Sequence, residues 1–227
     1  MTVRPISITQ SLVPGIGGAI DLVAYCARIS NPTNQHNVQT GPRLVSYLMR
    51  HRHWSPLEMV DITLEIRTTR DIARQLLRHR SFSFQEFSQR YAEAPSTMVV
   101  REARAQDSKN RQNSLPLVDP QVCQEWTQMQ EQVATLALSL YQEALRRGIA
   151  KEVARAILPE GMTESCLYMK GSLRSWLHYL QVRTDPSTQK EHRTLAEEIG
   201  RVIHELTGLE PQIEVWDSQG SPTPSPA

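Results

Sequence analysis

The sequence lacks the features that would commit a chain to a membrane or to export. Among its 227 residues, no apolar run approaches the roughly 18 residues that are needed to span a bilayer. The N-terminal stretch MTVRPISITQ has no basic segment followed by an apolar one, so it does not resemble a secretory signal. We therefore expect a cytoplasmic protein with no membrane partner.

Cysteine is scarce, and its spacing excludes two common uses. The chain has three cysteines, an odd number, with no CxxC pair and no histidine at the distance typical of a zinc site. His51 and His53 are two residues apart, a poor spacing for two ligands on one helix. The sequence therefore predicts reduced thiols, no disulfide framework and no metal.

Net charge is nearly absent. Lysine and arginine total 25 and aspartate and glutamate total 24, which leaves a formal charge of +1 and a pI near 7.8. A domain dedicated to nucleic acid usually has a pI above about 9, so this balance argues against such a partner. With 39% hydrophobic residues, the composition is typical of a globular chain.

Hydrophobic periodicity predicts an α+β fold that is rich in helix. Apolar and polar residues alternate over 60–67, a period of two that is typical of a strand with one buried face. The longest expected helix, 120–147, places Trp126, Met129, Val133, Leu136, Leu140 and Ala144 on one face. The remaining expected elements are strands at 3–9 and 166–169 and helices at 20–27, 42–51, 71–78, 150–158, 173–183 and 185–207.

No internal repeat or long linker divides the chain. We expect one domain over 1–216 with a small antiparallel sheet, and a mobile surface loop at 107–115 within it. Residues 217–227 form a stretch rich in proline and serine, which cannot bury much apolar surface and which we expect to be disordered.

Positive charge is concentrated between residues 67 and 90. This stretch reads RTTRDIARQLLRHRSFSFQEFSQR, with Asp71 and Glu86 as its only acids. In a helix over 71–78, Arg74 and Arg78 would repel each other unless an anion covered that face. Arginine is suited to binding phosphate because its planar guanidinium donates two parallel hydrogen bonds.

The residues after this cluster alternate in a way that suits a small ligand. In an extended segment, Glu86, Ser88 and Arg90 would point to one side, while Phe87 and Tyr91 would point to the other. The pattern favours a pocket for a phosphorylated molecule that bears hydroxyl groups. A solvated basic helix followed by an ordinary strand is the alternative.

A long motif makes the stretch recognisable. Arg78, His79 and Arg80, followed by Ser83, Glu86, Ser88 and Arg90, reproduce the RHRxxSxxExSxR signature of the flavin-dependent thymidylate synthases. Segments 27–30, 53–58, 152–159 and 173–183, followed by Gln189 and Glu191, resemble further blocks of this family in the same order. The resemblance covers all of the chain except its far end.

The resemblance implies an activity and an assembly. The family methylates dUMP to dTMP, with methylenetetrahydrofolate as carbon donor, FAD as redox cofactor and NADPH as reductant. It forms homotetramers whose sites are shared between subunits, which explains the lack of a Rossmann glycine motif in this sequence.

The resemblance also implies site residues. Arg183 is expected to be catalytic, because a guanidinium beside the pyrimidine favours its ionised, electron-rich form. The expected dUMP site consists of Gln75, Leu76, Leu77, Arg78, Glu86, Phe87, Ser88, Gln89, Arg90, Arg155 and Arg183. The expected FAD contacts are Ser30, His53, Ser55, Glu58, Arg78, His79, Arg80, Glu86, Ser172, Leu173, Arg174 and His178.

Three serines affect the assignment of these site residues. No general base is evident for Ser88, so we interpret it as a ligand contact rather than a nucleophile. Ser172 and Ser187 stand where the family commonly has Asn and His, and these differences concern the flavin edge.

Two other classes of function fit the basic stretch. A nucleic-acid-binding module would use it on backbone phosphates, with affinity that falls steeply as salt rises. A helical scaffold would use it on an acidic partner protein. Both alternatives predict a colourless protein that does not bind dUMP.

Overall fold

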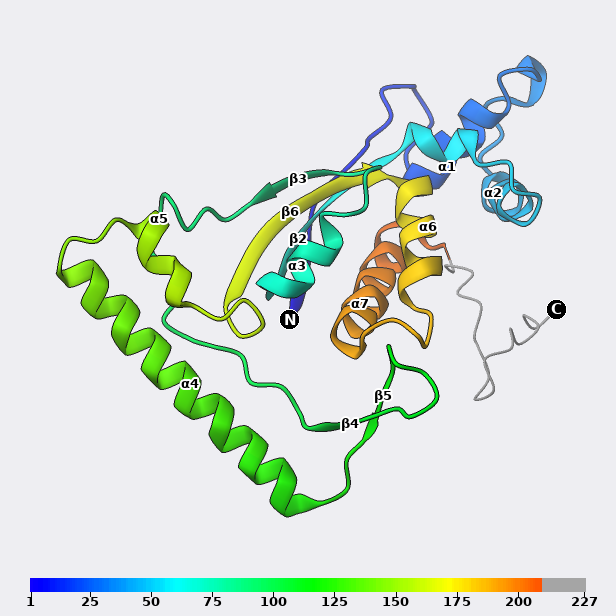
Figure 1. Ribbon diagram of the computed structural model, residues 1–227. Coiled ribbons are helices and arrows are strands. Elements are labelled where there is room, and N and C mark those ends of the chain that lie inside the picture. The colour runs from blue at the N-terminus through cyan, green and yellow to red at the C-terminus, as the bar shows by residue number, and fades with distance from the viewer. Residues whose placement is uncertain (210–227) are drawn as a thin grey trace.

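A four-stranded antiparallel sheet with the order β1-β2-β6-β3 organises the fold (Figure 1). The computed structural model describes residues 1–209. The four strands are β1 (Thr2–Ile8), β2 (Asp61–Thr69), β6 (Glu164–Ser172) and β3 (Ser83–Glu86). A separate two-stranded sheet pairs β4 (Arg104–Gln106) with β5 (Ser114–Pro116).

The helices flank the sheet on one side or stand apart from it. Figure 1 shows α3 and α6 beside the sheet, α7 next to α6, and the long α4 well away from this group. The helices are α1 (Ala19–Ala27), α2 (Gly41–Arg50), α3 (Arg70–Leu76), α4 (Pro120–Arg146), α5 (Lys151–Ala154), α6 (Leu173–Arg183) and α7 (Lys190–Thr207), with 3-10 turns η1 (Pro32–Asn34), η2 (Ser55–Met59) and η3 (Arg155–Ile157). The predicted helix-rich α+β fold is confirmed.

The central pair of strands forms the core of the sheet. β2 and β6 pair over nine residues each, from Asp61 opposite Ser172 to Thr69 opposite Glu164. Ile62, Leu64 and Ile66 of β2 are fully buried, as the alternation predicts, although Glu65 of the opposite face is buried as well. These three apolar residues pack in one continuous hydrophobic core with residues of α3, α6 and α7. Strand β6 contains the expected 166–169 and extends beyond it at both ends.

The long helix α4 follows its predicted bounds but buries an unexpected side. Its buried residues are Gln130, Ala137, Tyr141 and Ala144. Two of them, Tyr141 and Ala144, form a small second core together with Ala154 of α5 and residues around it. The continuous apolar face that the sequence showed is instead open to solvent. Five of its six residues are between 41% and 60% exposed, namely Trp126, Met129, Val133, Leu136 and Leu140, whereas the sixth, Ala144, is buried.

Three boundaries differ from the sequence expectation. The last helix begins at Lys190 rather than at 185, because Asp185 accepts hydrogen bonds from the backbone and hydroxyl of Ser187 and holds a turn. The expected helix over 150–158 is a single α turn, α5, followed by η3. Residues 107–113 connect β4 to β5, and Asp107 accepts from the backbone of Lys109, so this segment is the tip of a hairpin.

Parts of two expectations concern residues that the structure does not describe. The expected tail 217–227 and the end of the expected domain at 216 lie outside the described residues. Within residues 1–209, no helix is long and apolar enough to cross a membrane.

Gly171 shows how closely the sheet approaches the segment after α3. It lies in β6 opposite Ile62, and a Cβ atom built there would lie 2.4 Å from Cδ1 of Phe82. The Phe82 ring packs in turn on Trp176, with their centroids 4.7 Å apart. Only a residue without a side chain leaves room for this aromatic contact.

We predict that Gly171→Ala lowers the free energy of unfolding by about 1–3 kcal/mol, since the new methyl group must displace the Phe82 ring. Urea unfolding measures the loss. Gly161→Ala is the matched control, because its Cβ meets nothing within 4 Å. Equal stability of the two variants would contradict the close packing at Gly171.

Candidate functional site

The expected catalytic arginine touches the basic motif directly. Nε of Arg183, at the end of α6, donates a hydrogen bond of 2.9 Å to Nε2 of His79, just after α3. Burial, together with the charge of Arg183, lowers the pKa of His79 to about 4. His79 is therefore a neutral acceptor at physiological pH, and it fixes the orientation of the guanidinium without adding a second positive charge.

A buried polar cluster lies behind this contact. Nδ1 of His192 is 2.9 Å from Oε1 of Gln75, and its Nε2 is 3.1 Å from the hydroxyl of Tyr179. His192 is fully buried, and burial is the main cause that lowers its pKa to about 3. The ring of Tyr179 also meets the ring of His79 edge-on at 5.0 Å. Gln75, His79 and Arg183 thus belong to one network.

Sequence reasoning did not assign His192 to the site. The available signal was its spacing, since residues 192, 195, 196 and 199 share the buried face of α7. A histidine on an otherwise apolar face needs hydrogen-bond partners, which here are Gln75 and Tyr179.

A second group of expected residues surrounds a cavity of about 360 Å³. Gln89 and Arg155 line it together with Arg70 and Arg74 of α3, and Glu152 and Glu160 supply its acidic wall. Nε of Arg90 is 3.1 Å from Oε2 of Glu152. Gln89, Arg90 and Arg155 are therefore brought together in the fold.

Glu86 lies close to this group. It accepts a hydrogen bond of 2.7 Å from the hydroxyl of Ser165, and its Oε1 is 3.7 Å from Nη1 of Arg70. The carboxylate is thus held between β6 and the basic side of α3.

Two local expectations are wrong. Strand β3 ends at Glu86, and the backbone N–H of Tyr91 bonds to the carbonyl of Ser88 at 3.1 Å, so 88–91 is a turn in which side chains do not alternate. The expected repulsion between Arg74 and Arg78 does not arise, because α3 ends at Leu76. Arg74 instead forms an ion pair of 2.6 Å with Glu160.

The expected flavin contacts gather at the other end of β6. Nη1 of Arg174 donates to Oε1 of Glu58 at 2.7 Å. Hydrogen bonds from Ser172 and Arg174 outweigh burial and hold the pKa of Glu58 below its usual range. Ser172 also caps α6 by accepting from the backbone of Ser175.

The remaining members of this set come from neighbouring turns. His178 meets the ring of Trp54 edge-on at 4.8 Å, and burial lowers its pKa. The backbone N–H of Leu173 donates to the carbonyl of Val60 at 2.7 Å, which ties the start of α6 to the end of η2, the turn that contains Ser55 and Glu58. His53 is held by a backbone bond to Leu48.

Some expected site residues make no such contacts in one chain. Within residues 1–209, the side chains of Ser30, Arg78 and Arg80 have no hydrogen bond or ion pair, and all three are exposed. Leu77 is exposed as well, while Leu76 is buried in the core, and Phe87 is half-buried.

Two buried donors in the expected sites have no partner. Among the described residues, Nε2 of Gln89 and Nε of Arg174 are buried without an acceptor. Unpaired buried donors are costly, so their presence at both sites suits ligands that are rich in acceptor oxygen and nitrogen atoms.

Comparison with known proteins identifies relatives over nearly the whole chain. The family described as "Thymidylate synthase complementing protein" matches residues 11–207. The flavin-dependent thymidylate synthase of Synechocystis sp. is 52% identical over 199 residues, which cover 86% of this chain and 91% of that protein. The probable flavin-dependent thymidylate synthase of Paramecium bursaria Chlorella virus 1 is 49% identical over 196 residues, which cover 86% and 90%.

A solved structure shares the fold. The crystal structure of a UMP/dUMP methylase, PolB from Streptomyces cacaoi, bound with 5-Br dUMP, superposes with a TM-score of 0.79. Its sequence is 27% identical, and the match covers 93% of each chain.

We predict that His192→Asn reduces the loss of stability in acid. The pKa of His192 is about 3 in the folded chain against an ordinary 6.5, so the unfolded chain binds more protons between these values. Stability from this residue is fully present above pH 6.5 and falls as the pH drops towards 3, with a slope of up to about 1.4 kcal/mol per pH unit. Asparagine has an amide near the position of Nδ1 and does not titrate.

Urea unfolding at a series of pH values measures the difference between the two proteins. The wild-type curve should be the steeper one below neutral pH. Parallel curves would contradict the neutral, buried state of His192.

Proposed function

Because the chain belongs to the flavin-dependent thymidylate synthase family, we propose that it methylates dUMP to dTMP. The proposal names methylenetetrahydrofolate as carbon donor, FAD as redox cofactor and NADPH as reductant. The observation that carries it is the contact of Arg183 with a neutral His79, next to Gln75 in the same buried network. In a basic helix that only faced solvent, no neutral histidine would be needed to orient an arginine from another helix.

Arg183 is proposed to activate the pyrimidine. Its Nε is occupied by His79, whereas its two terminal amino groups have no partner within residues 1–209. Positive charge held beside N3 and a carbonyl oxygen stabilises the ionised ring, which makes the reacting carbons more electron-rich. No protein nucleophile is required, and Ser88 is proposed to bind the nucleotide.

The cavity around Arg155 is proposed to hold the phosphate of the nucleotide. Arg70, Arg74 and Arg155 line it, and Gln89 brings a buried N–H that lacks an acceptor. Planar guanidinium groups bind phosphate through paired hydrogen bonds. The ion pairs with Glu152 and Glu160 hold Arg90 and Arg74 in place until an anion competes for them.

The cluster at the start of α6 is proposed to hold FAD. Ser55, Glu58, Ser172, Leu173, Arg174 and His178 lie there, and the unpaired Nε of Arg174 fits a group rich in acceptors. When bound, FAD supplies hydride for the methylation. The protein keeps His178 neutral and Glu58 ionised, and His53 is proposed to face the folate.

Homotetramer formation is part of this proposal. The apolar face of α4 (Trp126, Met129, Val133, Leu136 and Leu140) is exposed in the single chain, and contiguous patches of this kind mark interaction sites. Ser30, Arg78 and Arg80 lack side-chain partners within residues 1–209, which is consistent with sites completed by a neighbouring subunit.

The visible absorption spectrum tests the proposed function. We expect a yellow protein that is bleached by NADPH and that forms dTMP from dUMP and methylenetetrahydrofolate. A colourless protein that binds polynucleotide with steep salt dependence, or one that binds neither dUMP nor flavin, would favour the alternative functions.

Arg183→Ala should reduce turnover by at least about 100-fold while the flavin remains bound, because it removes charge stabilisation at the pyrimidine. Steady-state dTMP formation and the flavin spectrum measure the two effects. Arg201→Ala is the matched control, since among the described residues Arg201 pairs only with Glu198 and Glu205, on the exposed side of α7. Wild-type turnover in the Arg183 variant would contradict the assignment.

Leu136→Glu should dissociate the proposed homotetramer, because it places a charge in the centre of the apolar face of α4. Light scattering measures the mass in solution. Leu12→Glu is the control, since Leu12 is exposed and lies far along the chain from α4. An unchanged tetramer in the Leu136 variant would contradict assembly through this face.

A further inference from the structure

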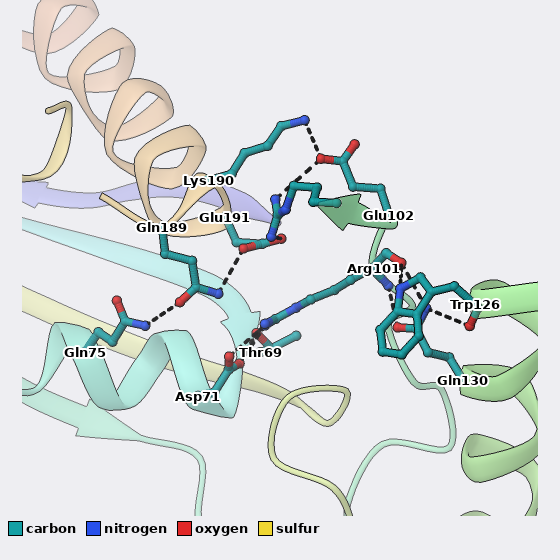
Figure 2. A network of polar contacts seen from close by, with 11 residues as sticks. Thr69, Asp71, Gln75, Arg101, Glu102, Trp126, Gln130, Gln189, Lys190 and Glu191 are labelled. Carbon is teal, nitrogen blue, oxygen red and sulfur yellow. Dashed lines mark hydrogen bonds and ion pairs between the residues drawn. The ribbon is translucent and has the colours of Figure 1, made fainter. Parts of the chain in front are cut away.

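A continuous row of hydrogen bonds leads from the start of α7 to the end of α3. Nε2 of Gln189 is 2.9 Å from Oε2 of Glu191, and Nε2 of Gln75 is 2.8 Å from Oε1 of Gln189 (Figure 2). Oε1 of Gln75 then meets Nδ1 of His192 at 2.9 Å, and the row ends at the hydroxyl of Tyr179.

Glu191 determines the direction of this row, that is, which group donates and which accepts in each hydrogen bond. An ionised carboxylate only accepts hydrogen bonds. Burial raises the pKa of Glu191, but hydrogen bonds from its own backbone and from Gln189, together with the charge of Arg104, lower it overall. Nη2 of Arg104 in β4 donates to Oε1 at 2.7 Å, which leaves Oε2 to face Gln189.

Each later bond follows from that first one. Gln189 must turn its amino group to Glu191, so its carbonyl oxygen accepts from Gln75. The amino group of Gln75 is thereby used, and its carbonyl oxygen must face His192. His192 then carries its proton on Nδ1, and its Nε2 accepts from Tyr179. One carboxylate thus determines the orientation of two amides and the tautomer of one imidazole.

We propose that Glu191 is a positioning residue, which acts through Gln189 to fix how Gln75 presents its amide to the pyrimidine nucleotide. With these bonds made, Gln75 keeps one N–H and one lone pair for the ligand, each in a defined place. The inference rests on the proposed function only in taking Gln75 as part of the dUMP site. The donor and acceptor roles along the row follow from the protein alone, without a bound ligand.

Glu191→Gln tests the proposal, because it should exchange the donor and the acceptor in each hydrogen bond of the row. The variant has one oxygen and one amino group where Glu191 has two oxygens. Arg104 is a cation and can accept nothing, so it retains the oxygen and the amino group turns to Gln189. Both glutamines then flip, and the proton of His192 moves to Nε2.

The fold should tolerate this change. Arg104 keeps Glu102, with Nη1 and Oε1 at 3.4 Å, as a second partner. In the variant, Nε2 of His192 donates to the buried hydroxyl of Tyr179, so the proton of this hydroxyl needs another acceptor.

Nitrogen-15 NMR of the histidine-labelled protein reads the tautomer directly. The signals of His192 are assigned by their loss in His192→Asn. We expect a protonated Nδ1 and an unprotonated Nε2 in the wild type, and the opposite pattern or a mixture in Glu191→Gln. A wild-type ring protonated on Nε2, or a tautomer that does not change in the variant, would overturn the proposal.

Calorimetric titration with dUMP measures the consequence for binding. The dissociation constant should rise about tenfold in Glu191→Gln, as expected for one misdirected hydrogen bond in a buried site. Glu205→Gln is the matched control, because it also removes a paired carboxylate on α7, and it should bind dUMP as the wild type does.

The experiments distinguish failure of the positioning role from failure of the proposed function. A tautomer switch with unchanged dUMP affinity would overturn the positioning role. If the wild type itself does not bind dUMP, the proposed function fails, whereas the tautomer measurement still decides the direction of the row.

Discussion

The structure depends on the nine-residue pairing of β2 with β6 at the centre of the sheet. Because the strands are antiparallel, α3 starts after β2 at one end of the pair and α6 starts after β6 at the other. Both helices pack into the same core, and their C-terminal ends meet where Arg183 contacts His79. A slip of one residue in this register would exchange the buried and exposed faces of both strands, and it would separate these two side chains.

Burial then controls the charge at that meeting point. His79 and His192 are both neutral, since desolvation lowers the pKa of each. Arg183 is consequently the cation of this network, and the remaining members only donate or accept hydrogen bonds. The acidic partners lie further out, with Glu152 and Glu160 at the cavity around Arg155 and Glu191 at the start of α7. This separation keeps positive charge at the place proposed for the pyrimidine and its phosphate.

Local patterns in the sequence predicted much of this. The alternation over 60–67 identified β2, and the spacing of Leu173, Trp176 and Leu180 identified α6. The arginine motif drew attention to His79, Glu86 and Arg90, which contact Arg183, Ser165 and Glu152 in the structure. Contacts between distant segments could not be predicted in the same way. Nothing near Arg74 in the sequence indicates Glu160, which is 86 residues away.

The failures have physical causes as well. Periodicity identifies an apolar face but not what covers it, so the exposure of the α4 face was not foreseen. The turn at 88–91 was missed because its residues are compatible with an extended segment, and the turn is held by a backbone bond to Ser88. His192 has a role only through Gln75 and Tyr179, which come from two other helices.

A crystal structure of the protein with 5-bromo-dUMP tests the central claim most directly, because the anomalous signal of bromine locates the pyrimidine independently of any interpretation of the protein. The account predicts a base in contact with Arg183 and Gln75 and a phosphate in the cavity lined by Arg155. Bromine located away from Arg183 in every subunit would contradict it.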